Sequence, residues 1–230
     1  MNIIITGANK GIGLELTKLF LQKKNNTVIA LSKSNNNLTK LAKLNAKLKI
    51  IKFDLENIAL LPGQMKDIGK SYKKIDVLIN NAGVLYNTVF ENTTYQQLES
   101  SISVNFKAPY IIIQKLLPQL KKSKAAHIVN ISSIGGVQGS LKFKGLSSYS
   151  PTKAALICLT ECLAEELKNT KISVNSLALG AVQTKMLQNA FPGYKATVSA
   201  KQMSKYIYNF ALTGHTLCNG KVISVSKSNP

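Results

Sequence analysis

The chain has 230 residues, of which 45% are hydrophobic, so it has the length of one domain and can bury a sizeable core. No apolar run approaches about 18 residues, and the first residues run directly into a strand-like segment, so we expect neither a transmembrane helix nor a signal peptide. Three cysteines lack metal-site and disulfide spacing, which favours a cytoplasmic protein without a metal centre. Two of them, Cys158 and Cys162, share a face of a predicted helix, where we expect buried free thiols.

The net charge of +20 comes from 30 lysines against 10 acidic residues, with no arginine. Such a surface could attract nucleic acid, an anionic membrane or an acidic carrier protein. The lysines are scattered over predicted helix faces and turns, and arginine is the residue suited to bidentate base contacts. We therefore expect a solvated lysine-rich surface with no nucleic-acid or membrane partner. An acidic carrier protein that delivers substrate remains an alternative.

A strand, a glycine-rich turn and a helix open the chain. Residues 2–6 are apolar, as in a strand buried on both faces of a parallel sheet, and a helical pattern follows the turn. This is the context of a dinucleotide fingerprint, in which a pyrophosphate lies at the helix N-terminus. The alternative is an ordinary glycine turn. The turn residues expected to bind the dinucleotide are Gly7, Asn9, Lys10, Gly11, Ile12 and Gly13.

The second predicted strand, residues 27–31, ends in Ser32-Lys33-Ser34. A dinucleotide fold often carries an acid here that hydrogen-bonds the ribose hydroxyls. A lysine and hydroxyls would instead attract a 2′-phosphate, and Lys10 could approach the same phosphate. The sequence therefore favours NADP(H) over NAD(H), with two solvent-facing lysines as the alternative reading.

Further strands alternate with helices along the rest of the chain. The third predicted strand ends in Asp54, the fourth in Asn80-Asn81-Ala82-Gly83, and the fifth in Ser132-Ser133. His127 starts the fifth strand and is expected to be structural or solvated. The remaining predicted strands are 49–53, 75–79, 126–131, 172–177 and 221–225, and the predicted helices are 36–46, one after Pro62-Gly63, one or two within 94–121, one after Pro151 and 200–211.

Tyr149 and Lys153 lie four residues apart on one face of a predicted helix. The ammonium favours phenolate, so we expect the pKa of Tyr149 to fall from about 10 towards the working pH. About one Tyr-x-x-x-Lys pair is expected by chance in a chain of this composition. The pair therefore indicates a function only in combination with the other motifs of the chain.

Taken together, these motifs resemble those of the classical short-chain dehydrogenase/reductase family over nearly the whole chain. The resemblance implies a three-layer, Rossmann-type doubly wound α/β fold with about seven mostly parallel strands, in one domain of residues 1–230. The motifs that carry it are Thr6-Gly7-x-x-x-Gly11-Ile12-Gly13, Asn80-Asn81-Ala82-Gly83, Asn105, Ser132-Ser133, Tyr149-x-x-x-Lys153 and Ala178-Leu179-Gly180-x-x-x-Thr184.

The resemblance also implies a role for each matching residue. Tyr149 would be the general acid/base, and Ser133 would orient the carbonyl oxygen. Lys153 would hold the nicotinamide ribose and lower the tyrosine pKa, while Asn105 would anchor a water chain to Lys153. The implied cofactor contacts outside the glycine turn are Ser32, Lys33, Asp54, Leu55, Asn81, Ala82, Gly83, Tyr149, Lys153, Val182 and Thr184.

The sequence departs from the family pattern at Leu179, where proline is usual. Residues 181–199 are expected to form the substrate loop, which is short and mostly apolar and suits a small or medium carbonyl or alcohol. The implied activity is hydride transfer between NADP(H) and that substrate. A non-catalytic NADP(H)-sensing protein on the same scaffold is the alternative. A homo-oligomer is expected, most simply a dimer through the two long central helices.

Overall fold

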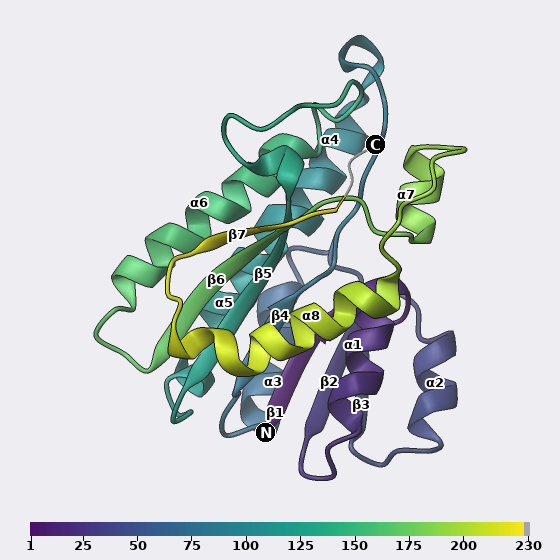
Figure 1. Cartoon of the computed structure of the whole chain (residues 1–230). Helices are drawn as coiled ribbons and strands as arrows, with labels where there is room; N and C mark the ends of the chain where they lie inside the picture. The colour runs from purple at the N-terminus through teal and green to yellow at the C-terminus, as the bar shows by residue number, and fades with distance from the viewer. Residues whose placement is uncertain (228–230) are drawn as a thin grey trace.

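The computed structural model describes residues 1–227, and its strands form one parallel sheet in the order β3-β2-β1-β4-β5-β6-β7 (Figure 1). The predicted sheet of about seven strands is confirmed. The predicted domain of residues 1–230 includes residues 228–230, which lie outside the described part. The strands are β1 (Asn2–Thr6), β2 (Thr27–Ser32), β3 (Leu48–Lys52), β4 (Val77–Asn80), β5 (Ala126–Ser133), β6 (Ile172–Leu179) and β7 (Val222–Val225).

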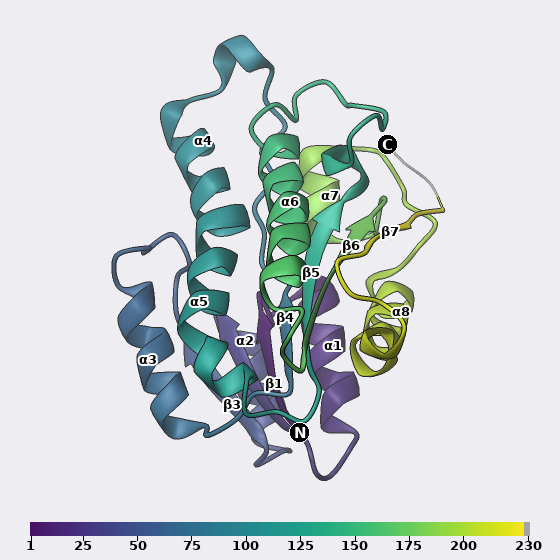
Figure 2. The same cartoon turned by 90° about the vertical axis from the view of Figure 1, so that its left-hand side faces the viewer.

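Helices cover both faces of the sheet and make three layers (Figures 1 and 2). One face carries α1 (Gly11–Leu21), α2 (Asn36–Ala42) and α8 (Ala200–Thr213). The other carries α3 (Leu61–Ser71), α5 (Ala108–Leu120) and α6 (Ser150–Glu166). Before α5 come α4 (Tyr95–Ile102) and a π-helical turn, η2 (Ser103–Lys107), and the short α7 (Lys185–Ala190) follows β6. Three 3₁₀ turns complete the described helices: η1 (Phe90–Asn92), η3 (Ile134–Gly136) and η4 (Gly214–Thr216).

The core consists of two hydrophobic clusters, one on each face of the sheet. Neighbouring residues of β1 belong to different clusters: Ile3 and Ile5 pack with α1 and α8, and Ile4 packs with α3 and α5. Because both faces are covered, the strands have no polar side, which explains their continuous apolar sequences. Each cluster is anchored by fully buried helical side chains such as Phe20 and Ile112.

The structure corrects the expectation that Cys158 and Cys162 are buried, because both are exposed. The side of α6 that faces the sheet carries Leu156 and Leu159, and the cysteines lie on the opposite side. The helix is therefore covered on one side only within the described part. Among residues 1–227, no helix combines the length and apolar character needed to cross a bilayer.

The parallel sheet gives the molecule two distinct edges. Every segment that leads from a strand into a helix lies at the carboxyl edge, and every segment that returns from a helix to a strand lies at the amino edge. Ligands of open parallel sheets bind at the carboxyl edge, which is where the sequence motifs fall.

Candidate active site

A cavity of about 570 Å³ opens at the carboxyl edge of the sheet. It is bounded by the carboxyl ends of the strands from β1 to β6 together with α7. Residues from distant parts of the chain converge on it, and sixteen of the predicted site residues line it: Gly7, Lys10, Gly11, Ile12, Ser32, Lys33, Asp54, Leu55, Asn81, Ala82, Gly83, Ser133, Tyr149, Lys153, Val182 and Thr184.

The glycine turn shapes one end of the cavity through close backbone contacts. A Cβ on Gly13 would lie 2.3 Å from the carbonyl oxygen of Gly7, and Gly7 itself has a φ of +66°. No side chain caps the N-terminus of α1, so its first backbone N–H groups are left for a ligand, and Gly11 and Ile12 line the cavity there. A glycine turn lets a ligand approach the backbone closely, and the helix N-terminus behind it has free N–H groups. This arrangement fits the pyrophosphate of a dinucleotide.

Two of the predicted turn residues, Asn9 and Gly13, do not line the cavity. The Asn9 side-chain oxygen accepts backbone N–H bonds from Asn37 (3.0 Å) and Leu38 (3.2 Å), and its amide donates to Ser34 Oγ (3.0 Å). Asn9 therefore fastens the glycine turn to the start of α2. Both residues support the shape of the turn from behind.

The end of β4 is fastened to the end of β1. Thr6 Oγ1 accepts the backbone N–H bonds of Asn81 (3.0 Å) and Ala82 (2.9 Å), and Asn81 Nδ2 donates to the Thr6 carbonyl (2.9 Å). These bonds hold the Asn-Ala-Gly segment in place as the floor of the cavity.

Asn105 lies behind this floor, fully buried in the π-helical turn η2. Its Oδ1 accepts the Val84 N–H (2.9 Å), and its Nδ2 donates to the Val84 carbonyl (3.0 Å) and to Thr152 Oγ1 (3.0 Å). A Cβ on Gly83 would lie 3.3 Å from Asn105 Oδ1 and 3.5 Å from Lys153 Nζ. Asn105 does not line the cavity, but Gly83 lies between its side chain and the Lys153 ammonium. Single π turns often occur at functional sites.

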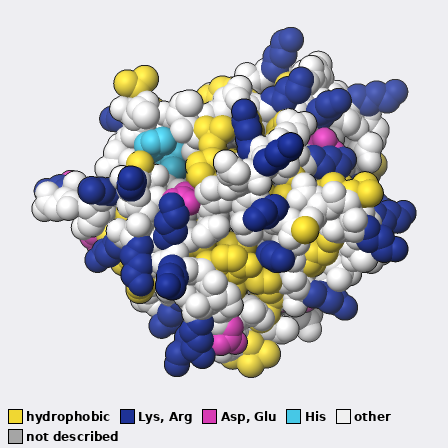
Figure 3. Space-filling model, turned by 90° about the horizontal axis from the view of Figure 1, so that it is seen from below, with side chains coloured by type: hydrophobic (Ala, Val, Ile, Leu, Met, Phe, Trp, Pro, Cys, Tyr) yellow, Lys and Arg dark blue, Asp and Glu magenta, His cyan; other side chains and the backbone are white. Residues whose placement is uncertain are grey.

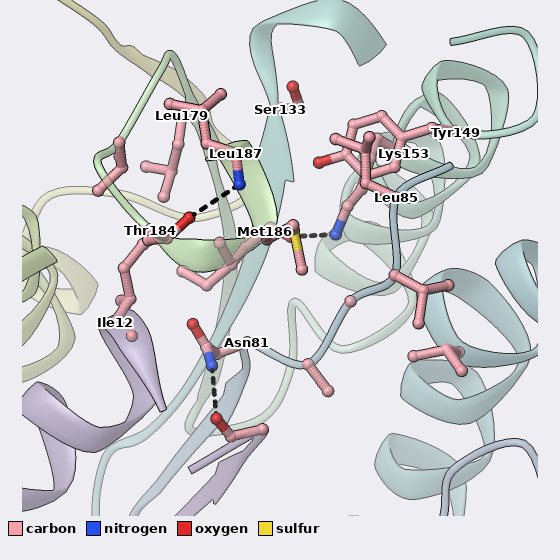
Figure 4. Close-up of a pocket in the computed structure, with 18 of the residues that line it drawn as sticks. Ile12, Asn81, Leu85, Ser133, Tyr149, Lys153, Leu179, Thr184, Met186 and Leu187 are labelled. Carbon is pink, nitrogen blue, oxygen red and sulfur yellow. Dashed lines mark hydrogen bonds between the residues drawn. The ribbon is translucent and has the colours of Figure 1, made fainter. Parts of the chain in front are cut away.

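Ser133, Tyr149 and Lys153 gather at one end of the cavity, and Ile12 and Asn81 lie at the other (Figure 4). Lys153 Nζ donates to the Ile131 carbonyl (2.9 Å) and lies 5.8 Å from the centre of the Tyr149 ring. Tyr149 precedes α6, so the helix presents the phenol and the lysine one turn apart, as the spacing predicted.

Burial dominates the electrostatics of this end of the cavity. It raises the pKa of Tyr149 to about 12, and the neighbouring Ser133 hydroxyl acts in the opposite direction. It also lowers the pKa of Lys153 to about 8. The predicted fall of the Tyr149 pKa is therefore wrong for this structure. The Lys153 ammonium donates to a main-chain carbonyl. The cost of burying a phenolate therefore outweighs any stabilisation of the phenolate by this ammonium.

The predicted phosphate ligand Lys33 already has a partner. Its ammonium lies 2.8 Å from Asp54 Oδ2 and 3.8 Å from Glu56 Oε1, and the Asp54 carboxylate raises the pKa of Lys33. Lys33 is largely exposed, so this pair is weak. The sequence offered no signal for it, because Lys33 and Asp54 belong to different strand ends.

An apolar wall that only the structure reveals surrounds the tyrosine. Leu85, Phe143 and Leu146 come from the loops after β4 and β5 and line the cavity beside Tyr149. Opposite them are Met186 and Leu187 of α7, whose first turn is capped by Thr184 Oγ1 accepting the Leu187 N–H (3.3 Å) (Figure 4). Leu179, the last residue of β6, also lines the cavity.

The sequence profile described as short chain dehydrogenase matches residues 1–195. The chain belongs to the short-chain dehydrogenase family. Its relatives include an uncharacterised oxidoreductase of Staphylococcus epidermidis, 26% identical over 96% of this chain and 95% of the relative. Another is a 3-oxoacyl-[acyl-carrier-protein] reductase of Thermotoga maritima, 32% identical over 80% of this chain and 75% of the relative.

Solved structures of the family agree with the fold over almost the entire chain. A 4-hydroxyisoleucine dehydrogenase complexed with NADH superposes with a TM-score of 0.88 at 27% identity, covering 98% of this chain and 96% of that one. An NADPH-bound carbonyl reductase from chicken fatty liver gives 0.86 at 26% identity, covering 97% and 95%. The chain is therefore an oxidoreductase of this family, and its fold implies a nicotinamide cofactor.

Proposed function

We propose that the protein transfers hydride between NADP(H) and a small or medium carbonyl or alcohol substrate, with Tyr149 as the general acid/base. One observation carries this proposal. Tyr149, Lys153 and Ser133 are brought together at one end of a cavity whose other end is an uncapped helix N-terminus behind a glycine turn.

The residues of the chain supply proton chemistry and positioning. With its pKa raised to about 12, Tyr149 is a protonated donor at neutral pH and can give its proton to a carbonyl oxygen. Ser133 offers a second hydroxyl to that oxygen. Lys153 would hold a ribose with its ammonium, and Asn105 would help to relay protons from solvent towards it. The bound dinucleotide would supply the hydride.

The preference for NADP(H) rests on Lys10 and Lys33, which line the adenosine end of the cavity. The ion pair of Lys33 with Asp54 is solvent-exposed, so a 2′-phosphate can compete for the ammonium at small cost. The nearby Asp54 and Glu56 carboxylates oppose a phosphate there. We therefore expect a preference set by Lys33 rather than an absolute specificity.

The apolar wall around Tyr149 favours a substrate that is partly apolar. Residues 181–199 form the proposed substrate loop, of which Met186, Leu187 and Phe191 line the cavity. Some relatives are 3-oxoacyl-[acyl-carrier-protein] reductases, so an acidic carrier protein is the alternative source of the substrate. A carrier-linked substrate would then show steep salt dependence of turnover, and a free substrate would not.

We also propose that two copies of the chain pair across the face formed by α4, α5 and α6 (Figure 2). Tyr95 is 77% exposed on α4, and Leu98 and Tyr110 are exposed further along the same helical segment. An apolar stripe beside the uncovered side of α6 is suited to an isologous interface. A cytoplasmic location stays a prediction.

Replacing Tyr149 with phenylalanine tests the proposal. Removal of one hydroxyl is expected to lower kcat for carbonyl reduction by at least about 10²-fold, while NADPH still raises the melting temperature. Tyr206→Phe, at an exposed position on α8, is the matched control. Full activity of Tyr149→Phe would refute the mechanism. Binding of NADPH by the unmodified protein without turnover of any member of a panel of aldehydes and ketones would favour the non-catalytic sensing protein.

A further inference from the structure

The amino edge of the sheet gathers lysines that are far apart in the sequence. Six segments return from a helix to a strand there, all within residues 1–227, and Asp76 is their one acidic residue. Figure 3 views this edge and shows dark blue lysines spread over it with few acidic side chains among them. The exposed lysines of the six segments are Lys23, Lys24, Lys43, Lys47, Lys73, Lys74, Lys121, Lys122, Lys124, Lys168, Lys171 and Lys221.

Composition alone does not produce this distribution. The segments at the carboxyl edge are longer in total, yet they hold fewer lysines, and they include the acids Asp54, Glu56 and Glu91. A drift towards lysine across the whole chain would enrich both edges alike. The excess of positive charge is therefore a property of the amino edge.

Helix dipoles account for only part of the excess. A lysine just after a helix, such as Lys121 or Lys168, offsets the partial negative charge of the last carbonyls, and this effect is confined to the last turn. Lys171 and Lys221 stand immediately before strands instead. Of the twelve, Lys74 and Lys168 are the ones that form ion pairs within the described residues. The other ammonium groups are exposed and have no acidic partner among residues 1–227.

Two leucines flank this positive face. Leu44 is 86% exposed and Leu217 is 91% exposed. Their segments precede β3 and β7, the two outer strands of the sheet, which are six strand spacings or about 29 Å apart. Single exposed leucines are ordinary on protein surfaces, but these two lie at opposite ends of one lysine-rich face.

We propose that this amino-edge face, made of the twelve lysines with Leu44 and Leu217, docks on an anionic lipid membrane. Lysines near a membrane surface are attracted to anionic headgroups, and apolar side chains at the same level enter the boundary between headgroups and acyl chains. A nucleic acid would gain nothing from the leucines. The cavity lies at the opposite edge, so it stays open to water. This proposal differs from the expectation drawn from the sequence, which was a solvated surface with no membrane partner.

Cosedimentation with phosphatidylcholine vesicles, with and without about 30% phosphatidylserine, tests the proposal. We expect binding only when phosphatidylserine is present, and weaker binding at about 0.15 M than at about 0.05 M salt. The variant K121E/K122E/K124E is expected to lower the partition coefficient at least about tenfold. The control K144E/K201E/K205E makes the same charge change away from this edge and is expected to change it by less than about threefold.

The leucines are tested separately, because their role is what distinguishes a membrane from other polyanions. Leu44→Ser with Leu217→Ser is expected to lower vesicle binding several-fold without changing net charge. Thermal melting verifies that each variant is folded. If K121E/K122E/K124E does not fold, K171Q/K221Q replaces it as a milder substitution at the same edge. Equal binding to neutral vesicles, or equal losses in the two triple variants, would overturn the proposal. The proposal would also be overturned if the protein retained random DNA at about 0.15 M salt and the variant with both leucines changed to serine retained it equally well.

Discussion

The two edges of the sheet use buried polar groups in opposite ways. At the carboxyl edge, Thr6 and Asn105 fasten the backbone around a cavity and leave Tyr149 and Lys153 facing it. At the amino edge, several buried polar groups are paired with other parts of the chain, although the buried Gln119 Oε1 and His215 Nδ1 have no hydrogen-bond partner among the described residues. Asp76, for example, accepts bonds from the Asn2 N–H (2.8 Å) and Ser123 Oγ (2.7 Å). The carboxyl-edge arrangement leaves titratable groups available for chemistry, whereas the amino-edge hydrogen bonds hold neighbouring segments of the fold together.

His127 is the buried amino-edge side chain whose two ring nitrogens both have partners. Its Nδ1 donates to the Ala211 carbonyl (3.1 Å), and its Nε2 accepts from Asn175 Nδ2 (3.0 Å). Asn175 is itself held in orientation, since Nδ2 donates to the Cys218 carbonyl and Oδ1 accepts the Lys221 N–H. This network fixes one neutral tautomer of the histidine. Substitutions at the carboxyl edge should therefore affect turnover first, and those at the amino edge should affect stability first.

The largest effect is expected at Lys153. Lys153→Met removes the ammonium at similar volume, and we expect kcat for carbonyl reduction to fall by about 10²–10³-fold with little loss of melting temperature. In the unmodified protein, kcat should fall as the pH rises through about 8, because the buried ammonium loses its proton there. Initial rates across pH measure both effects. A flat profile up to pH about 10 would contradict the assignment.

His127 should control stability in acid. Burial lowers its pKa from 6.5 to about 4, so the fold favours the neutral ring and protonation favours the unfolded chain. Its contribution is complete above pH 6.5 and is lost as the pH falls towards about 4, by at most about 3 kcal/mol. Urea unfolding at several pH values measures it. The unmodified protein should lose its stability advantage over His127→Gln in that window, while the turnover of the two at pH about 7 stays similar.

Gly13 tests how closely the carboxyl edge is packed. Gly13→Ala places a Cβ against the Gly7 carbonyl, and we expect it to lower the free energy of unfolding by about 1–3 kcal/mol and to weaken NADPH binding. Gly63→Ala is the matched control, since a Cβ there meets nothing within 4 Å and lies in the first turn of α3. It should raise stability by up to about 1 kcal/mol. Equal effects of the two substitutions would mean that the turn is not tightly packed.

Lys33 carries the smallest expected effect. Lys33→Gln should weaken NADPH binding by about 1 kcal/mol and leave NADH binding almost unchanged, because only the 2′-phosphate needs the ammonium. Titrations followed by melting temperature compare the two cofactors. Lys144→Gln, at an exposed position in the loop after β5, serves as the control. If NADH stabilises the unmodified protein as well as NADPH does, the proposed preference is absent.

The fold was accessible from the sequence because its signals are local. A short apolar run such as residues 2–6, followed by a glycine turn, favours a strand buried on both faces, and the glycines of that turn allow the close contact of Gly13 with Gly7. The Tyr149–Lys153 spacing likewise specifies a shared helix face. These features depend on neighbours within a few residues, so the sequence contains them directly.

Features that depend on distant segments were missed or predicted wrongly. The pKa of Tyr149 depends on burial by loops from elsewhere in the chain, and that burial outweighs the lysine one turn away. The ion pair of Lys33 with Asp54 joins two strand ends. The exposure of Cys158 depends on which side of α6 the sheet occupies. The lysines of the amino edge looked scattered because only the parallel topology places their six segments together.

The exposed cysteines provide a built-in reporter of subunit pairing. Cys158 and Cys162 interact one helical turn apart on the uncovered side of α6, and that interaction raises the pKa of the Cys162 thiol. Cys218 is half-buried in the segment before β7. A thiol reagent should therefore label the two helical cysteines of a single copy readily, and a second copy packed over α6 should shield them. Counting labelled thiols by mass spectrometry as the protein is diluted then reports its association without changing one residue.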